Sequence, residues 1–417
     1  MYLSTFGKTY VEMKILHTAD WHLGKRLENI SRHDEQVVVL DEICAIADRE
    51  NVDAVIIAGD LFDVFNPPNE SAELFFKTCK RLSNNGLRAV IAIAGNHDSP
   101  ERIEAPEMLA RECGIIFSGF PNSHVQPFSL PTGLALTQSD KGFVELKLPN
   151  SAYPLRLFLS PYANEFRLRQ YLNIENPEED IRQILTEQWY ALAQKYADTE
   201  GVNIGVAHLF VMQANGVAPI EPEEEKPINV GGAGAVYSDC FPTQLQYVAM
   251  GHLHWQQEID TQPCPIVYSG SPLAYSFAED NQDKYVMLLD AKPNQPIDFQ
   301  RIKLEKNKKL LRGRFDNLDD ALQWLAENPD DLMQLTIVSD TYLNPLMTQQ
   351  LRAAHKGIVQ IIPEIEDVNS LNKTQNIDLN KRIDELFFDY FKTKENQEPN
   401  EDLKALFKEV LAVELEN

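Results

Sequence analysis

Five short stretches of the sequence place histidine, aspartate or asparagine directly after an apolar run. They are HTADWHLG (17–24), GDLFD (59–63), GNHD (95–98), AHLF (207–210) and GHLH (251–254). Carboxylate, imidazole and amide oxygen are ligands that suit Mn²⁺ or a similar divalent ion. Taken together, the five stretches therefore offer the donors of a metal centre.

The donors are sufficient for two ions. A two-metal centre needs one anionic ligand that bridges the ions and about three ligands for each of them. Asp60 can bridge through its two carboxylate oxygens, and His97 is not needed as a ligand. We predict two divalent ions, Mn²⁺ with Mg²⁺ as the alternative, one held by Asp20, His22 and His254 and the other by Asn96, His208 and His252.

Each of these residues also has a structural interpretation, because Asp and Asn are common in turns. Apart from His17, which still belongs to the apolar run, five of the nine histidines nevertheless fall in these stretches together with Asp and Asn, and this joint pattern favours the metal site. The remaining histidines are predicted to be structural or at the surface, with His17 a neighbour of the site: His17, His33, His124 and His355. Trp21 and Trp255 are predicted to pack rather than to stack on bases.

The elements around these stretches must bring the donors together. Each stretch follows four to eight residues rich in Val and Ile, which predicts strands buried on both faces. Helical spacing covers residues 34–49 and 70–84, and Asn69 is the candidate N-cap of the second helix. Strands that alternate with helices indicate an α/β domain, in which the carboxyl ends of the strands can share one cleft.

The character of the chain changes after KYVMLLDAK (284–292), which is predicted to be the last strand of the main domain. Residues 309–363 then read as strand, helix, strand, helix and strand, a compact unit of its own. Residues 216–234 read as a long acidic loop, and Met13 is predicted to be the natural start. We predict an N-terminal extension (1–12), a main domain (13–295), a capping domain (296–366) and a helical tail after a linker (367–417).

Composition limits the classes of protein that fit. The 417 residues are 43% hydrophobic and 24% charged, which is typical of a globular chain. The formal net charge of -25 argues against a freestanding nucleic-acid binder, whose binding face is normally basic. The sequence contains no run of eighteen apolar residues, so no membrane span is predicted. The five cysteines lack C-x-x-C spacing, which favours a reducing cytoplasm.

The five stretches, taken in order, resemble the signature of the calcineurin-like metallophosphoesterases. The flanking residues, among them AGDLFDVFNPP and VYSGSPLAYSFAED, are similar to the nuclease subunits of bacterial double-strand-break repair complexes. This resemblance implies a four-layer α/β/β/α core, a small α+β capping domain and a C-terminal helical hairpin. The main domain is then a metallophosphoesterase nuclease domain.

The resemblance also implies a function and partners. We expect a nuclease that acts on DNA as an ATP-dependent double-strand exonuclease and as an endonuclease on single-stranded and hairpin DNA, in repair and recombination. The expected partner is a large SMC-like ATPase, bound by the helical tail, with a homodimer of this chain inside a heterotetramer. Residues 70–84 and 101–112 are predicted to form the dimer contact, although core packing explains their apolar positions equally well.

The reaction expected from the resemblance is phosphodiester hydrolysis. His97 is assigned as general acid or as a donor to the leaving oxygen, with Asp98 as the group that orients it. Candidate phosphate contacts are Lys25, Arg26 and Arg32, and Asp63 is expected beside the ligands. Two alternatives stay open: another phosphoesterase of this fold, such as a phosphatase or a cyclic-nucleotide phosphodiesterase, and a non-catalytic scaffold.

Overall fold

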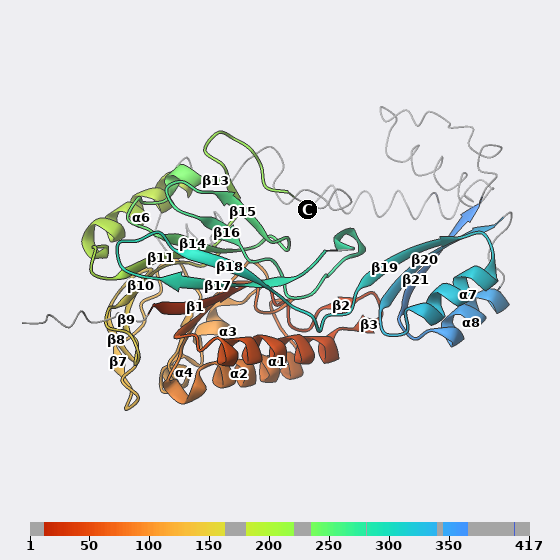
Figure 1. Cartoon of the computed structure of the whole chain (residues 1–417), viewed down its shortest axis with the longest axis horizontal. Coiled ribbons are helices and arrows are strands. Elements are labelled where there is room, and N and C mark those ends of the chain that lie inside the picture. The colour runs from red at the N-terminus through yellow and green to blue at the C-terminus, as the bar shows by residue number, and fades with distance from the viewer. Residues whose placement is uncertain are drawn as a thin grey trace, which may run out of the picture. The chain divides into compact units, whose positions relative to one another are not determined.

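The computed structural model describes residues 12–162, 181–220, 235–280, 282–339, 345–365 and Lys404. The predicted tail at 367–417 lies outside these residues except for Lys404, as does most of the acidic loop at 216–234. Among the described helices, none combines the length and the apolar character needed to cross a lipid bilayer. The larger part of the described chain consists of two β-sheets between layers of helices (Figure 1).

The first sheet has six strands. In spatial order they are β18 (Asp298–Lys303), β17 (Tyr285–Ala291), β1 (Met13–Thr18), β4 (Ala54–Ala58), β5 (Ala89–Ile93) and β6 (Ile115–Ser118). The neighbours β1, β4, β5 and β6 run parallel to one another, whereas β17 runs antiparallel to both of its neighbours, β1 and β18. Every residue of β4 and β5 is buried, which explains their unbroken apolar sequences.

The second sheet has eight strands, of which β16, β14, β11 and β10 are parallel neighbours. In spatial order the sheet contains β15 (Gln257–Asp260), β16 (Ile266–Tyr268), β14 (Tyr247–Gly251), β11 (Val202–His208), β10 (Leu155–Ser160), β9 (Phe143–Lys147), β8 (Ala135–Asp140) and β7 (Phe128–Ser129). Two short strand pairs lie outside the main sheets: β2 (Arg26–Leu27) with β3 (Ile30–Ser31), and β12 (Val211–Met212) with β13 (Val236–Tyr237).

Helices cover the outer face of each sheet (Figure 1). The outer face of the first sheet packs in one apolar cluster with α1 (His33–Arg49), α2 (Asn69–Leu82), α3 (Pro100–Glu104) and α4 (Glu107–Arg111). The outer face of the second sheet packs with α6 (Ile181–Tyr196). A third cluster joins the inner faces of the two sheets. These four layers are the predicted α/β/β/α core, and burial of the apolar faces holds them together.

Two boundaries differ from the prediction. The main domain does not end with β17, because β18 pairs with it over six residues in the first sheet. No apolar run marks β18, since it is an edge strand whose residues are exposed or half-buried. Pro68, not Asn69, occupies the N-cap position of α2, and no side chain caps this helix. Asn69 is the first residue of the helix instead.

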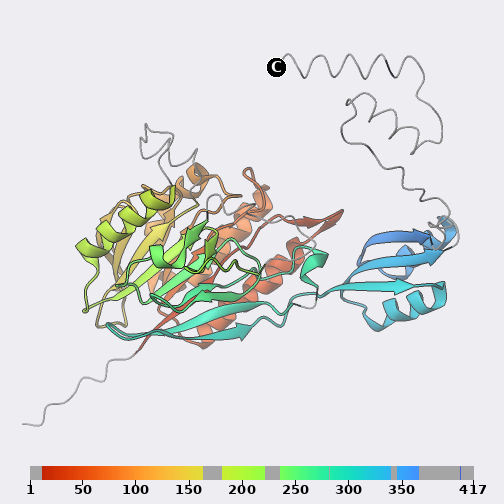
Figure 2. The same ribbon diagram turned by 90° about the horizontal axis from the view of Figure 1, so that it is seen from above.

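The five elements predicted between residues 309 and 363 are all present. They are β19 (Leu310–Phe315), α7 (Leu318–Glu327), β20 (Leu332–Ser339), α8 (Pro345–Ala354) and β21 (Ile358–Ile365). The strands form a three-stranded sheet in the order β19-β20-β21, with α7 and α8 on one side of it (Figure 1 and Figure 2). Asn317 caps α7 by accepting a hydrogen bond from the Asp320 amide at 2.8 Å.

His17 on β1 links the two sheets. Its side chain is fully buried; Nε2 donates to the Met250 carbonyl at 3.2 Å, and Nδ1 lies 3.1 Å from the Tyr247 hydroxyl. Burial lowers the pKa of His17 to about 3, because the charged imidazole would lose its hydration, although the Met250 carbonyl opposes the shift. The predicted structural role of His17 agrees with these contacts.

His17 should make the fold sensitive to acid. The unfolded chain takes up a proton on this residue below pH 6.5 and the folded chain does not, so stability falls as the pH drops from 6.5 towards 3. At pH 5 the loss amounts to about 2 kcal/mol relative to pH 7. Urea unfolding at both pH values should therefore show a smaller acid-induced loss for His17→Gln than for the wild type. An equal loss in the two proteins contradicts the assignment.

Candidate metal centre

All five stretches lie close together in space, because each follows the carboxyl end of a parallel strand in one of the two sheets. Asp20 and His22 follow β1, Asp60 follows β4, and Asn96 and His97 follow β5 in the first sheet. The second sheet adds His208 at the end of β11, with His252 and His254 just after β14. The structure therefore brings the seven predicted ligands to the same place.

Main-chain hydrogen bonds fix the turns that carry these side chains. The amides of Asp20 and His22 donate to the carbonyls of Gly59 and Asp60, both at 3.0 Å, so the turns after β1 and β4 run side by side. The His252 amide donates to a carboxylate oxygen of Asp20 at 2.9 Å and ties the second sheet to the first. Asp20, His22, Asp60 and His252 all have φ between 42° and 107°, a strained region for residues other than glycine.

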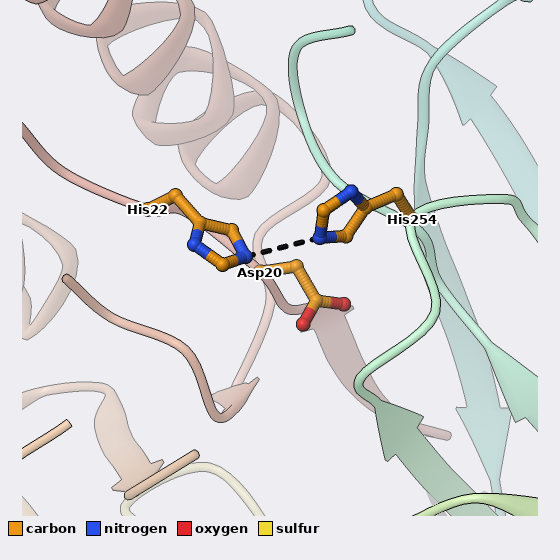
Figure 3. Close-up of side chains that lie close together, drawn as sticks. All are labelled: Asp20, His22 and His254. Carbon is orange, nitrogen blue, oxygen red and sulfur yellow. Dashed lines mark hydrogen bonds between the residues drawn. The ribbon is translucent and has the colours of Figure 1, made fainter. Parts of the chain in front are cut away.

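One cluster consists of Asp20, His22 and His254, whose candidate ligand atoms lie within 4.8 Å of one another. Nε2 of His22 and Nε2 of His254 are 3.0 Å apart, with the Asp20 carboxylate beside them (Figure 3). Two unprotonated imidazole nitrogens repel each other at this distance, so a proton or a cation must lie between them. Nδ1 of His22 faces the Asp63 carboxylate at 3.6 Å, which leaves Nε2 as the ligand atom.

A second cluster contains Asp60, His208 and His252. The Asn96 Oδ1 atom lies 3.0 Å from Nε2 of His208 and 2.9 Å from Nδ1 of His252, so its amide oxygen belongs to the same group. Nδ1 of His208 donates to the Ala58 carbonyl at 2.8 Å, which leaves Nε2 for a cation. Asp60 also lies within reach of His22 and is thus placed between the two clusters.

The glycines of the signatures are required by close contacts. A Cβ atom on Gly95 would lie 2.1 Å from a carboxylate oxygen of Asp60, and one on Gly59 would lie 2.2 Å from Nδ1 of His208. Gly59 also has a φ of +93°, which only glycine adopts without strain. These positions admit no side chain because the ligands themselves fill the space.

Burial and the charges of neighbouring side chains shift the pKa values of the site in opposite directions. Burial raises the pKa of Asp20 to about 7, even though His208 and His254 lower it. Burial would also raise the pKa of Asp60, but His208 and His22 hold it well below its usual range. The pKa of His208 rises to about 9, because Asp60 and Asp20 outweigh the opposing effect of burial. In the ion-free protein, protonated His208 thus supplies the charge that a cation would replace.

His97 is half-buried and lies beside both clusters. Its ring packs against His22 with the ring centroids 4.8 Å apart, and its amide donates to Asp60 at 2.9 Å. Asp98 does not orient this ring as predicted, because the hydrogen bond at Nδ1 goes to the Asp63 carbonyl at 2.8 Å. The buried Asp98 carboxylate instead accepts from the amides of Leu61, Phe62 and Gly95. Asp98 therefore shapes the turns that carry Asp60 and Asn96.

The three basic residues that were predicted to contact phosphate lie in different surroundings. Arg32 is fully buried, donates twice to Glu35 and binds the Ala274 carbonyl at 2.7 Å, so it has no free donor face for a phosphate. Its prediction as a phosphate contact is wrong for this reason. Lys25 is partly exposed and forms an ion pair with Asp63 at 2.9 Å. The exposed Arg26 donates to the Asn29 carbonyl.

Aromatic residues around the site depart in part from the prediction. Trp21 is fully buried and packs against Phe75, as predicted, but Trp255 is 37% exposed and is not a packing residue. The sequence analysis missed Tyr275, whose buried ring packs edge-on against His22 and His254 and whose hydroxyl donates to the Trp21 carbonyl. It also missed Glu279, which lies 3.5 Å from Nδ1 of His254. Only their place in VYSGSPLAYSFAED could have drawn attention to them.

Comparisons with known proteins agree with this geometry. A family model described as calcineurin-like phosphoesterase matches residues 13–256. A protein of Bacillus subtilis (strain 168), named as the SbcD subunit of the nuclease SbcCD, is 34% identical over 407 residues, which cover 95% of this chain and 97% of that protein. The chain belongs to the SbcD family of calcineurin-like phosphoesterases. A protein of Staphylococcus saprophyticus with the same name is 28% identical over 387 residues, 91% of this chain and 92% of that protein.

Calcineurin-like phosphoesterases use divalent metal ions, and the donor set of this chain fits such ions. Carboxylate, imidazole and amide oxygens converge there, and the paired Nε2 atoms of His22 and His254 need a positive charge between them. The family resemblance inferred from the five stretches is therefore confirmed.

Cation binding should release protons, because a ligand must be deprotonated before it coordinates a cation. With a pKa of about 9 for His208 and about 7 for Asp20, the ion-free site holds protons at neutral pH. The affinity for Mn²⁺ should therefore rise as the pH increases from 6 to 9. Titration calorimetry at pH 7, in buffers with different ionisation enthalpies, should detect the protons released. An affinity that is the same at pH 6 and pH 9 contradicts this expectation.

Proposed function

We propose that this chain is a metal-dependent DNA nuclease that acts in double-strand-break repair and recombination together with an SbcC-type SMC-like ATPase. In that complex it is an ATP-dependent double-strand exonuclease and an endonuclease on single-stranded and hairpin DNA. The observation that carries the proposal is the pair of ligand clusters at the carboxyl ends of both sheets, with Asp60 of the second cluster 3.5 Å from Nε2 of His22 in the first. The names of the similar proteins support a nuclease over other phosphoesterases.

The roles of the residues follow from their positions. Asp20, His22 and His254 would hold one ion, Asn96, His208 and His252 the other, and Asp60 both. Such ions neutralise charge on the scissile phosphate and lower the pKa of the attacking water when they are bound. Mn²⁺ suits this mixture of imidazole and oxygen donors, with Mg²⁺ as the alternative.

His97 is the proposed proton donor to the leaving oxygen. Its Nδ1 atom donates to the Asp63 carbonyl, so Nε2 is the atom that transfers the proton. Because the ring is only half-buried, a substrate can reach it. The Asp63 carbonyl fixes the direction of the ring, and the Asp63 carboxylate pairs with Lys25, the proposed phosphate contact.

The net charge of -25 requires that part of the affinity for DNA comes from elsewhere. The two ions, a second copy of the chain and the ATPase are the proposed sources. Part of the predicted dimer contact is core, since Phe75, Cys79 and Leu82 of α2 are fully buried. Exposed apolar side chains on α2 and α4 support a homodimer within the heterotetramer: Phe76, Met108 and Leu109. All five cysteines are free, which suits the cytoplasm.

Hydrolysis assays distinguish the proposal from the two alternatives. With Mn²⁺, ATP and the ATPase, the wild type should degrade linear and hairpin DNA and should leave a phosphomonoester intact. Asp60→Ala should bind neither ion firmly and should lose activity, because the shared ligand is gone. Hydrolysis of the phosphomonoester with intact DNA would indicate a phosphatase. Binding of Mn²⁺ without hydrolysis of either substrate would indicate a scaffold.

His97→Ala should separate chemistry from metal binding. The variant should keep both ions and lose about 10²- to 10⁴-fold in DNA cleavage, the usual contribution of a general acid. His124→Ala is the matched control, since His124 is exposed and contacts only Gln126 and Ser139 among the hydrogen bonds described for its ring. Metal analysis of the purified variants provides the ion content. If His97→Ala loses an ion, His97 is a ligand and not the proton donor.

A further inference from the structure

A buried ion pair lies directly behind His254. Glu279 belongs to a short 3-10 helix (Phe277–Glu279), and Lys284 precedes β17; both residues are 2% exposed, and their side chains bind each other. Lys284 also donates to the Ser271 hydroxyl and to the His254 carbonyl, both at 3.1 Å. The pair therefore connects three separate segments of the chain at one point.

His254 is held at two positions by this pair. Lys284 binds its carbonyl oxygen, and the Glu279 carboxylate lies 3.5 Å from its ring Nδ1 atom. The Tyr275 amide donates to the same carboxylate at 2.9 Å, and the Tyr275 ring packs edge-on against the His254 ring. The direction of the imidazole is thus set from its back and from its side.

The arrangement determines which nitrogen of His254 can bind a cation. An ionised carboxylate accepts hydrogen bonds and donates none, so Nδ1 of His254 must carry the proton. Nε2 then presents its lone pair, and it lies 3.0 Å from Nε2 of His22, next to Asp20 (Figure 3). Lys284 keeps the carboxylate ionised and fixed although water does not reach it.

The partner of Nδ1 distinguishes His254 from His208 and His97, whereas His22 also faces a carboxylate, that of Asp63 at 3.6 Å. His208 and His97 are each oriented by a main-chain carbonyl, that of Ala58 and that of Asp63. His254 faces a charged carboxylate instead, which makes Nε2 a stronger ligand than a neutral partner would. A buried ion pair is costly to maintain, and apolar side chains could fill the same space. Because the pair lies against the ring and the carbonyl of His254, orientation of this ligand explains why charged side chains occupy the space.

We propose that Glu279 is a positioning residue that fixes the tautomer and direction of His254 and strengthens its Nε2 atom as a ligand for a divalent cation. This inference rests on the proposed function, because it assigns the Asp20–His22–His254 cluster to an ion. Glu279 itself touches neither ion nor substrate. Its contribution is to the affinity of one of the two sites, and the other site does not depend on it.

Glu279→Gln tests the proposal, with Mn²⁺ alone as the probe. Titration calorimetry of the full chain should show binding at one site weakened about 10- to 100-fold and binding at the other unchanged. Glu279→Gln combined with Lys284→Met removes both charges, so the melting temperature should return towards that of the wild type while the weak site stays weak. Glu145→Gln is the matched control: it breaks the buried ion pair with Arg156 on β9 and β10 and should change neither affinity.

The outcomes separate this inference from the proposed function. If the wild type binds no Mn²⁺, the proposed function fails, and this inference fails with it. If the wild type binds two ions and both folded Glu279 variants do so with the same affinities, only the positioning role is overturned. It is likewise overturned if the double variant recovers both melting temperature and affinity, because Glu279 then acts on the fold alone.

Discussion

Two buried carboxylates at the junction of the sheets impose the main constraint on this molecule. Asp20 and Asp60 are at most 2% exposed, and burying such charges is unfavourable unless opposite charge lies close by. The first sheet supplies these carboxylates, whereas the second supplies His208, whose ring nitrogens lie 3.9 Å from Asp20 and 3.3 Å from Asp60. The sheets therefore meet at this edge through complementary charge, in addition to the apolar contacts between their inner faces.

This constraint explains why the local sequence around the ligands is so restricted. Carboxylates that are held without water need donors from the main chain, and the turns deliver them through strained positive φ values at Asp20, Asp60 and His252. The amide of His252 on Asp20 and the amide of His97 on Asp60 are such donors. Glycines stand where ligands and main chain come into contact. The same features that make the signature recognisable are those that the buried charge requires.

The sequence was sufficient to predict an α/β domain and the convergence of the seven donors, because both follow from short apolar runs that end in polar residues, and the family resemblance added the four-layer arrangement. It failed for features that depend on distant partners. β18 has no apolar pattern, since it completes an edge beside β17. Arg32 looked like a phosphate contact, but Glu35 and the Ala274 carbonyl satisfy its donors in the interior. Asp98 follows His97 directly, yet its carboxylate turns towards the amides of Leu61 and Phe62. No known sequence spacing connects Glu279 with His254, so their contact could not be predicted.

The division of the ligands between the sheets has a consequence for the order of synthesis. Asp20, Asp60 and Asn96 leave the ribosome within the first hundred residues, and the histidines of the second sheet follow only after residue 200. The nascent chain thus carries this half of the site, with His22 and His97, for a long interval before His208 and His254 are made. If β1, β4 and β5 paired early, they would bury these carboxylates without His208 and His254, so the ligand-bearing edge gains its full set of opposite charges only when β11 and β14 have been translated. Assembly of the site then coincides with the docking of one half of the core onto the other.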